Sequence, residues 1–200
     1  MARVSFDSSM MEAIDDHRVA WATSAAKAVM TLGTTHQVLV GFALVAAVVV
    51  VLLGAYRPAM AAVAALVVAA VVSVALKHIF DRGRPPAHLI VAGATGPSFP
   101  STHAAVTSAI AVAILVATPW RTSREARTAA FLLAVLVAVV GGCMVYLGAH
   151  WPTDVLAGWL LGGTIGWAAG LPSRRRRRAR DLDGPAPDRL LDDGKPAHHE

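Results

Sequence analysis

Residues 58–76 of the chain read PAMAAVAALVVAAVVSVAL, an apolar run without a charged side chain. A helix needs roughly 17 to 25 such residues to cross the hydrocarbon core of a bilayer. The apolar residues do not alternate with polar ones, as they would in the strands of a membrane barrel. The stretch therefore predicts a membrane-spanning α-helix.

Similar apolar runs lie on both sides of this one, at residues 38–56, 104–120, 128–147 and 155–171. In the whole chain, 56% of the residues are hydrophobic and 16% are charged, whereas about 25% are charged in a typical soluble domain. We therefore expect an all-α, polytopic membrane helix bundle of about five to six helices, with residues 36–172 as its membrane domain.

The N-terminal segment, residues 1–35, differs from the apolar runs because it is amphipathic. Its charged side chains include Glu12, Asp15, Asp16, Arg18 and Lys27. Burying a charge in the bilayer centre costs about 3 kcal/mol, so we expect an amphipathic helix on the membrane surface. The segment lacks the basic start and short apolar core of a cleaved signal peptide. We therefore expect the mature chain to begin near Met1.

Basic residues outside the apolar runs predict the orientation of the chain in the cell membrane. They are Arg57, the group Arg121, Arg124 and Arg127, and the cluster at residues 174–178. If five spans alternate, these places share one side, which the positive-inside rule identifies as the cytoplasm. We therefore expect a cytoplasmic C-terminus and extracytoplasmic loops at residues 77–103 and 148–154. If the N-terminal segment crossed the membrane, only the N-terminus would change sides.

Residues 173–200 form a basic juxtamembrane segment followed by a tail rich in Asp, Gly, Pro and Ala. The tail has no periodic apolar face, which predicts disorder from residue 181 onward. Nucleic-acid binding is an alternative explanation of the basic cluster, but no aromatic residues are interleaved with it, as single-strand binding requires. Contacts with anionic lipid headgroups explain it better. We therefore expect membrane lipids, and not nucleic acid, as partners.

Two features of the apolar runs concern how the helices pack. Cys143 is the only cysteine and cannot form a disulfide within the chain. Glycines recur every four residues at 158, 162, 166 and 170, which places them on one helix face and lets another helix approach closely. The partner helix lies either in the same chain or across a homodimer.

The first polar cluster closes the second apolar run and reads KHIFDRGRP at residues 77–85. It holds three cations, Lys77, Arg82 and Arg84. Such side chains can simply extend from a helix end toward water. Alternatively, they bind a multiply charged anion, with Arg giving paired hydrogen bonds to phosphate oxygens and Lys acting as a point charge.

The second cluster, Pro100-Ser101-Thr102-His103, directly precedes the third apolar run. Ser101 is a favourable N-cap residue. The free N–H groups and the positive end of the helix dipole would then face the outward loop, where they favour a phosphate. The alternative is that these residues only cap the helix.

The third cluster contains His150 and Asp154, between the last two apolar runs. Pro152 and Asp154 fit the first turn of a helix. The Asp154 carboxylate could accept the His150 N–H, which would fix the tautomer and raise the basicity of the imidazole. The alternative is that His150 and Trp151 anchor the helix at the membrane interface. A metal site is not expected, because no further His or carboxylate accompanies this pair.

In order, the clusters read Lys-x6-Arg-Pro, Pro-Ser-x-His and His-x3-Asp. This order resembles the signature of the type-2 phosphatidic acid phosphatases, the lipid phosphate phosphatases, and the resemblance extends over residues 38–171. It implies a bundle of about six helices and metal-independent hydrolysis of a lipid phosphate monoester or pyrophosphate, without an organic cofactor. It leaves open whether the lipid is phosphatidic acid, phosphatidylglycerol phosphate or a polyprenyl phosphate.

The resemblance also implies roles for single residues. His150 resembles the nucleophile that forms a phosphohistidine, Asp154 the residue that orients it, and His103 the acid that protonates the leaving lipid oxygen. The residues implied in phosphate binding are Lys77, Arg84, Ser101 and the backbone of Thr102.

The chain departs from the family pattern at two places. Thr102 stands where Gly is commoner, which keeps the backbone N–H. Cys143 and Met144 stand where the family has Ser-Arg, so a phosphate-binding Arg is missing. Loss of one such preorganised donor typically costs on the order of 10² to 10³ in rate, unless Arg82 compensates. Two hypotheses follow: an active lipid phosphatase, or a catalytically weak or inactive relative that binds lipid phosphates or partner proteins.

Overall fold

The computed structural model describes residues 5–34, 50, 54–92 and 95–182. These residues form the α-helices α1 (Ser5–Asp16), α2 (Ala20–Thr34), α4 (Tyr56–Phe80), α5 (Thr102–Ala117), α6 (Ser123–Tyr146) and α7 (Pro152–Leu182), with a short 3-10 helix, η1 (Ala87–Leu89). No strand occurs in these ranges, and the all-α prediction is confirmed. The run predicted at residues 38–56 falls almost entirely outside the described residues.

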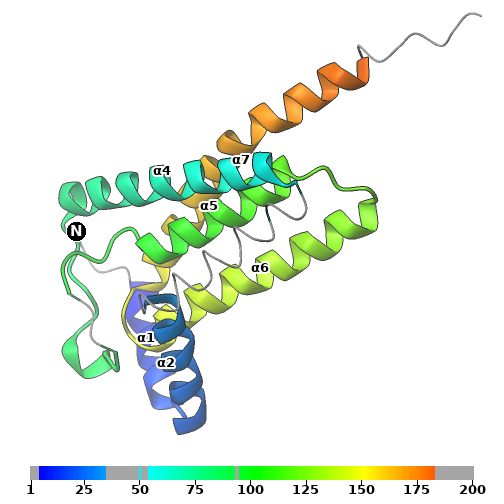
Figure 1. Cartoon of the computed structure of the whole chain (residues 1–200). Helices are drawn as coiled ribbons and strands as arrows, with labels where there is room; N and C mark the ends of the chain where they lie inside the picture. Colours follow the sequence, from blue (N-terminus) through cyan, green and yellow to red (C-terminus); the bar gives the residue numbers. More distant parts are fainter. Residues whose placement is uncertain (1–4, 35–49, 51–53, 93–94, 183–200) are drawn as a thin grey trace, which may run out of the picture.

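Helices α4, α5, α6 and α7 form a bundle in which α5 packs against each of the other three (Figure 1). Helices α4, α6 and α7 are long and apolar enough to cross a membrane. Many of their large apolar side chains face outward, including Val71, Leu136 and Leu160, as expected where lipid replaces water. Helix α5 has 16 residues and is shorter than the run predicted at 104–120, because it ends at Ala117 before Pro119.

The glycine stripe of α7 packs against α5 of the same chain. A Cβ added at Gly162 would lie 2.0 Å from the Ala105 carbonyl oxygen, and one at Gly166 would lie 2.3 Å from that of Ala109. These distances allow only a hydrogen atom at the two glycines. Of the two alternatives for the stripe, the structure therefore shows packing within the chain.

Helix α7 extends beyond the predicted span at 155–171. It continues through Pro172 to Leu182, so the basic cluster at residues 174–178 is helical, and in Figure 1 this end of α7 projects beyond the bundle. The tail predicted to be disordered from residue 181 begins with two helical residues, and residues 183–200 lie outside the described ranges.

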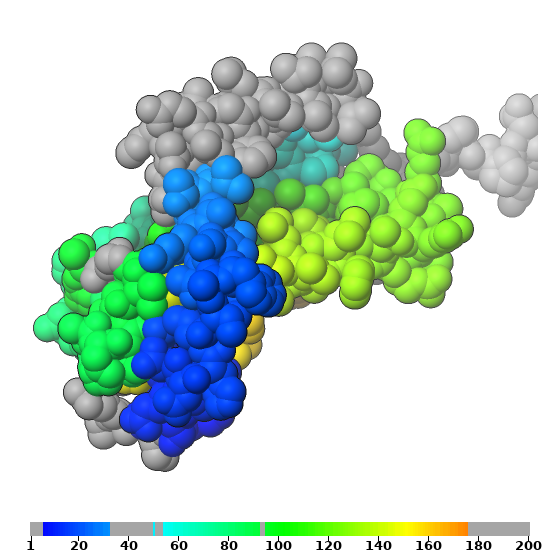
Figure 2. Space-filling view, turned by 90° about the horizontal axis from the view of Figure 1, so that it is seen from below, coloured from blue at the N-terminus to red at the C-terminus, as the bar shows by residue number. Residues whose placement is uncertain are grey.

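Helices α1 and α2 lie across one end of the bundle (Figures 1 and 2). In Figure 2 they run between the green segment after α4 and the yellow-green α6. Met11 is fully buried in a core cluster that includes Leu89, Met144 and Trp151, while Phe6 and Trp21 are exposed. The single amphipathic helix expected on the membrane surface is therefore two helices, and part of its apolar face packs on protein.

Candidate active site

Three chain segments meet at the end of the bundle that α1 and α2 cover: the segment after α4, the start of α5, and the turn from α6 to α7. Backbone hydrogen bonds join them. Two bonds run between segments, from Ser101 N–H to Asp154 O (3.0 Å) and from Val91 N–H to Leu147 O (2.9 Å), and a third, from Ser98 N–H to Arg82 O (2.8 Å), closes the loop between α4 and α5. The three polar clusters of the sequence are thereby brought to one place.

The turn from α6 to α7 depends on Gly148. Its φ of +73° lies in the left-handed region, and an added Cβ would lie 2.1 Å from the Leu89 carbonyl oxygen. Only glycine satisfies both the conformation and the close approach. Gly148 therefore sets how closely the turn that carries His150 approaches the segment after α4.

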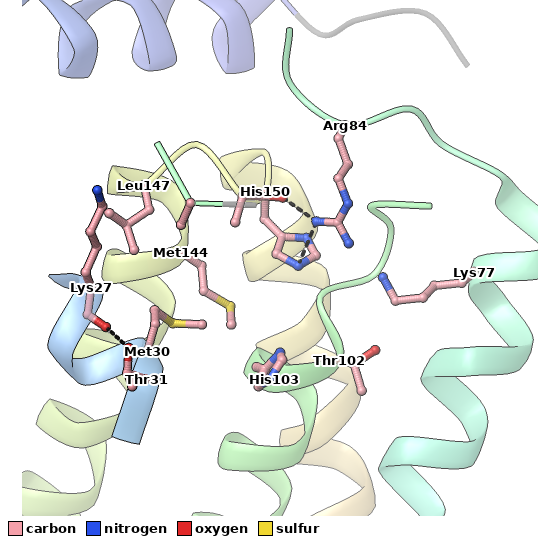
Figure 3. Close-up of a pocket in the computed structure, with 12 residues that line it drawn as sticks. Lys27, Met30, Thr31, Lys77, Arg84, Thr102, His103, Met144, Leu147 and His150 are labelled. Carbon is pink, nitrogen blue, oxygen red and sulfur yellow. Dashed lines mark hydrogen bonds between the residues drawn. The ribbon is translucent and has the colours of Figure 1, made fainter. Parts of the chain in front are cut away.

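A cavity of about 530 Å³ opens between these segments (Figure 3). Residues from five parts of the chain line it: Lys27, Met30 and Thr31 of α2, Lys77 of α4, Arg84 and Ala92 of the following segment, Thr102 and His103 of α5, and Met144, Leu147, Ala149 and His150 around the turn from α6 to α7. Figure 3 shows His103, His150, Lys77 and Arg84 around the same open space.

Lys77 and Arg84 supply the positive charge on one side of the cavity. Lys77 Nζ donates to the Pro97 carbonyl at 2.7 Å, and Arg84 donates to the carbonyls of Thr95 and Ala149. Within the described residues, neither cation has a carboxylate within ion-pair distance. Their charge is therefore available to an anion, as the phosphate-binding prediction requires.

His150 is buried at the turn before α7, and its Nε2 lies 3.4 Å from Arg84 NH1. Its Nδ1 faces Asp154 Oδ2 at 3.6 Å, which is ion-pair range but too long for a hydrogen bond. The predicted pairing of His150 with Asp154 is therefore present as proximity only. Burial lowers the pKa of His150 from its usual 6.5, and the Asp154 carboxylate opposes this shift, so the imidazole is neutral at pH 7.

Asp154 is held by groups other than His150. Its Oδ2 accepts the Trp151 N–H at 3.0 Å, and its Oδ1 accepts from Arg82 NH1 at 2.6 Å. These bonds fix the carboxylate at the start of α7 and explain why it does not turn fully toward the His150 ring.

Ser101 is the N-cap of α5, as predicted, because its Oγ accepts the Ala104 N–H. The same hydroxyl is fully buried and donates to Met144 Sδ at 3.3 Å. Ser101 therefore does not line the cavity with its side chain, whereas Thr102 does. Met144 also lines the cavity, so an apolar thioether occupies the wall where the family pattern has an Arg.

Arg82 was expected to be able to contact the phosphate, but the structure places its guanidinium elsewhere. Its guanidinium donates to Asp7, Thr153 and Asp154, and its side chain is only 9% exposed. It is not among the residues that line the cavity. Two buried carboxylates hold Arg82 outside the lining of the cavity, so in this structure it does not take the place of the missing Arg.

Sequence reasoning missed Asp7 and the contribution of α2 to the cavity wall. Asp7 was one of several carboxylates in a segment assigned to the membrane surface. The signal available was its spacing, because Asp7 lies four residues before Met11 and so shares the apolar face of α1. Nothing in the sequence of α2 indicates that Lys27, Met30 and Thr31 line the cavity.

The described residues contain no group of three or more His, Cys, Asp or Glu side chains that could hold a metal ion. The charged and imidazole side chains that line the cavity are Lys27, Lys77, Arg84, His103 and His150, a set that suits an anionic ligand.

Comparison with known proteins extends these observations. A family model described as the PAP2 superfamily matches residues 58–178. An undecaprenyl-diphosphatase of Sulfolobus acidocaldarius is 36% identical over 110 residues, which is 52% of this chain and 49% of that protein. The putative undecaprenyl-diphosphatase YbjG of Escherichia coli is 39% identical over 106 residues, 51% of this chain and 50% of that protein.

A decaprenylphosphoryl-5-phosphoribose phosphatase of Mycobacterium tuberculosis is 34% identical over 116 residues, 56% of this chain and 60% of that protein. The chain thus spans about half the length of the curated relatives it matches. Among solved structures, the PAP2-type phosphatidylglycerolphosphate phosphatase of Bacillus subtilis has a TM-score of 0.68 and 22% identity, with 86% of each chain covered. Aquifex aeolicus LpxE has a TM-score of 0.64 and 22% identity, covering 83% of this chain and 95% of that one. These two structures share the fold of this chain.

Proposed function

The chain belongs to the PAP2 superfamily and is a membrane protein, and from this starting point we propose that it is a phosphatase that hydrolyses a lipid phosphate monoester or pyrophosphate. The observation that carries the proposal is the cavity, where Lys77, Arg84, His103 and His150 meet. Two cations that pair with no carboxylate in the described part of the chain stand beside a buried imidazole, an arrangement suited to a phosphate group.

In the proposed reaction, the lipid phosphate enters the cavity and its oxygens bind Lys77 and Arg84. The neutral His150 attacks phosphorus through Nε2, the nitrogen that faces Arg84, so a P–N bond forms while the bond from phosphorus to the lipid oxygen breaks. His103 donates a proton to the leaving oxygen. The Nδ1–H faces Asp154, whose negative charge stabilises the positive charge that develops on the ring.

The second half of the reaction returns the enzyme to its first state. Water attacks the phosphohistidine, His103 takes a proton from that water, and the P–N bond breaks to release inorganic phosphate and neutral His150. The scheme requires no metal or organic cofactor, because the two cations neutralise the phosphate charge.

The proposal also covers the side of the membrane that the cavity faces and the class of lipid that is hydrolysed. The basic residues at 121–127 and 174–178 support a site on the extracytoplasmic face, by the positive-inside rule. The named curated relatives act on undecaprenyl diphosphate or a decaprenylphosphoryl sugar phosphate, which puts polyprenyl phosphates first among the lipids to test.

Met144 favours a second candidate function. It lines the cavity at the position where the family pattern has an Arg, and it contributes no charge. The alternative is therefore a catalytically weak or inactive relative that binds lipid phosphates.

The deciding assay measures phosphate release by the purified protein in detergent against polyprenyl diphosphate, phosphatidic acid and phosphatidylglycerol phosphate. The phosphatase proposal predicts release that vanadate inhibits and EDTA leaves unchanged. Binding of these lipids without release would support the alternative. Release that EDTA abolishes would contradict the scheme without a metal.

A further inference from the structure

A chain of buried charges links the N-terminal helix to the candidate active site. Asp7 on α1 and Asp154 on α7 are both fully buried, and Arg82 lies between them. Arg82 NH2 donates to Asp7 Oδ2 at 2.6 Å, and Arg82 NH1 donates to Asp154 Oδ1 at 2.6 Å. Because a guanidinium is planar and rigid, it holds the two carboxylates in one fixed arrangement.

Asp7 also binds the first turn of α7 directly. Its Oδ1 accepts the Thr153 N–H at 3.1 Å, and its Oδ2 accepts from Thr153 Oγ1 at 2.6 Å. The Thr153 N–H is one of the donors that a helix start leaves without a partner, and a negative charge is favourable there. Asp7 thus holds the residue next to Asp154 as well as the cation that binds Asp154.

Stability alone explains this arrangement poorly. Burying charged groups costs several kcal/mol per ion, and well-packed apolar residues often stabilise a protein at least as well. The other described carboxylates of α1, namely Glu12, Asp15 and Asp16, are not fully buried. The one buried carboxylate of α1 is directed at the residues that surround Asp154.

Building on the proposed phosphatase function, we propose that Asp7 is a positioning residue of the active site, which acts through Arg82 to set the place and the effective charge of the Asp154 carboxylate beside His150. The N-terminal helix α1 is then part of the catalytic unit and not only a membrane-surface segment.

Among the described residues, the charged and titratable groups that act on His150 are Asp154, Arg84, Lys77 and His103, and Lys27 of α2 lines the same cavity. Asp154 is the only acid in this set. The positive charge of Arg82 offsets part of the negative charge of Asp154, and the negative charge of Asp7 in turn offsets part of the charge of Arg82. Without the charge of Asp7, the full positive charge of Arg82 acts on Asp154 and weakens its effect on His150. The pKa of His150 then falls further, and the positive charge that forms on the imidazole during attack on phosphorus is stabilised less.

The first test is Asp7→Asn, with Glu12→Gln as the matched control because Glu12 is an exposed carboxylate on the same helix. We expect kcat to fall roughly 10- to 100-fold, a typical effect of misplacing a reacting group, while KM changes little because the cavity cations are untouched. The acid limb of the kcat/KM profile should move to lower pH. Loss of folded protein alone would lower the apparent kcat without moving this limb.

The second test asks whether Asp7 acts through Arg82. If it does, Asp7→Asn should cause little further loss of kcat in a chain that already carries Arg82→Gln. The Asn amide oxygen can still accept the Thr153 N–H, so the substitution mainly removes the charge of Asp7. Multiplied losses in the double variant would therefore show that this charge acts independently of Arg82, which would overturn the proposal.

A measurement without turnover separates this proposal from the proposed function. NMR titration of imidazole-labelled histidines in detergent, with His150→Ala to assign the signal, reports the pKa of His150 even if no lipid is hydrolysed. We expect a lower value in Asp7→Asn than in wild type and Glu12→Gln. If Asp7→Asn does not fold, Asp7→Ser is the smaller neutral substitute. An unchanged His150 titration in a folded Asp7 variant would overturn the proposal, whereas an inactive wild type would overturn only the phosphatase function.

Discussion

At the scale of single residues, His103 and His150 reach the same cavity from different segments of the chain, so their roles can be tested separately. We expect His103→Ala to reduce hydrolysis of alkyl phosphates strongly and of nitrophenyl phosphate only weakly. The physical reason is that nitrophenolate leaves without a proton, whereas an alkoxide needs a general acid. Rates with both substrates check this, and equal losses would argue against His103 as the proton donor.

Met144 is the second residue whose replacement is informative. Met144→Arg should raise kcat and substrate affinity about tenfold or more, because a guanidinium in a preorganised site is worth roughly 3 kcal/mol and binds phosphate through two hydrogen bonds. Met144→Leu should bring no gain, and Met144→Lys a smaller one. Steady-state kinetics with a thermal-unfolding check would test this. A folded Met144→Arg that still binds vanadate without a gain in rate would contradict the prediction.

Residue types and spacing predicted the cavity better than they predicted hydrogen-bond partners. The two histidines, Lys77 and Arg84 come together because their three segments end at the same end of the bundle. Arg82 is a residue whose partners the sequence did not predict, because a cation two residues from Arg84 is equally plausible as a phosphate contact. Its direction depends on Asp7, a residue distant in sequence whose burial follows from tertiary packing.

At the scale of elements, the contact of α5 with α7 depends on glycines. We expect Gly162→Ala to destabilise the bundle by about 1–3 kcal/mol or more, because the added Cβ would lie 2.0 Å from the Ala105 carbonyl oxygen. The neighbouring Gly163→Ala is the control, since its Cβ would meet only Ser108 Oγ at 3.7 Å. Thermal unfolding in detergent measures both. Equal melting temperatures would show that this close packing is not required.

Helix positions were more predictable than helix ends. The apolar runs located α4, α6 and α7, because a bilayer demands long uninterrupted apolar stretches. Composition did not predict that α7 continues through Pro172 and the basic cluster. The tight packing of α5 against α7 was suggested by the glycine spacing, but the spacing could not distinguish a partner in the same chain from one in a dimer.

For the molecule as a whole, the prediction to test is its orientation in the membrane, with the cavity on the extracytoplasmic side. In a Cys143→Ser background, we expect His88→Cys on η1 to react with an impermeant maleimide in intact cells, and Arg124→Cys at the start of α6 to react only after lysis. Both positions are exposed, so accessibility reports the side of the membrane. The reverse pattern would place the cavity on the cytoplasmic face.

The most direct test of the account is whether His150 carries the phosphoryl group. Wild-type protein should be quenched with base during turnover of a ³²P-labelled lipid phosphate, because a P–N bond survives base and breaks in acid. We predict base-stable label on His150 and neither label nor phosphate release in His150→Ala. Undiminished phosphate release by a folded His150→Ala variant would contradict the account.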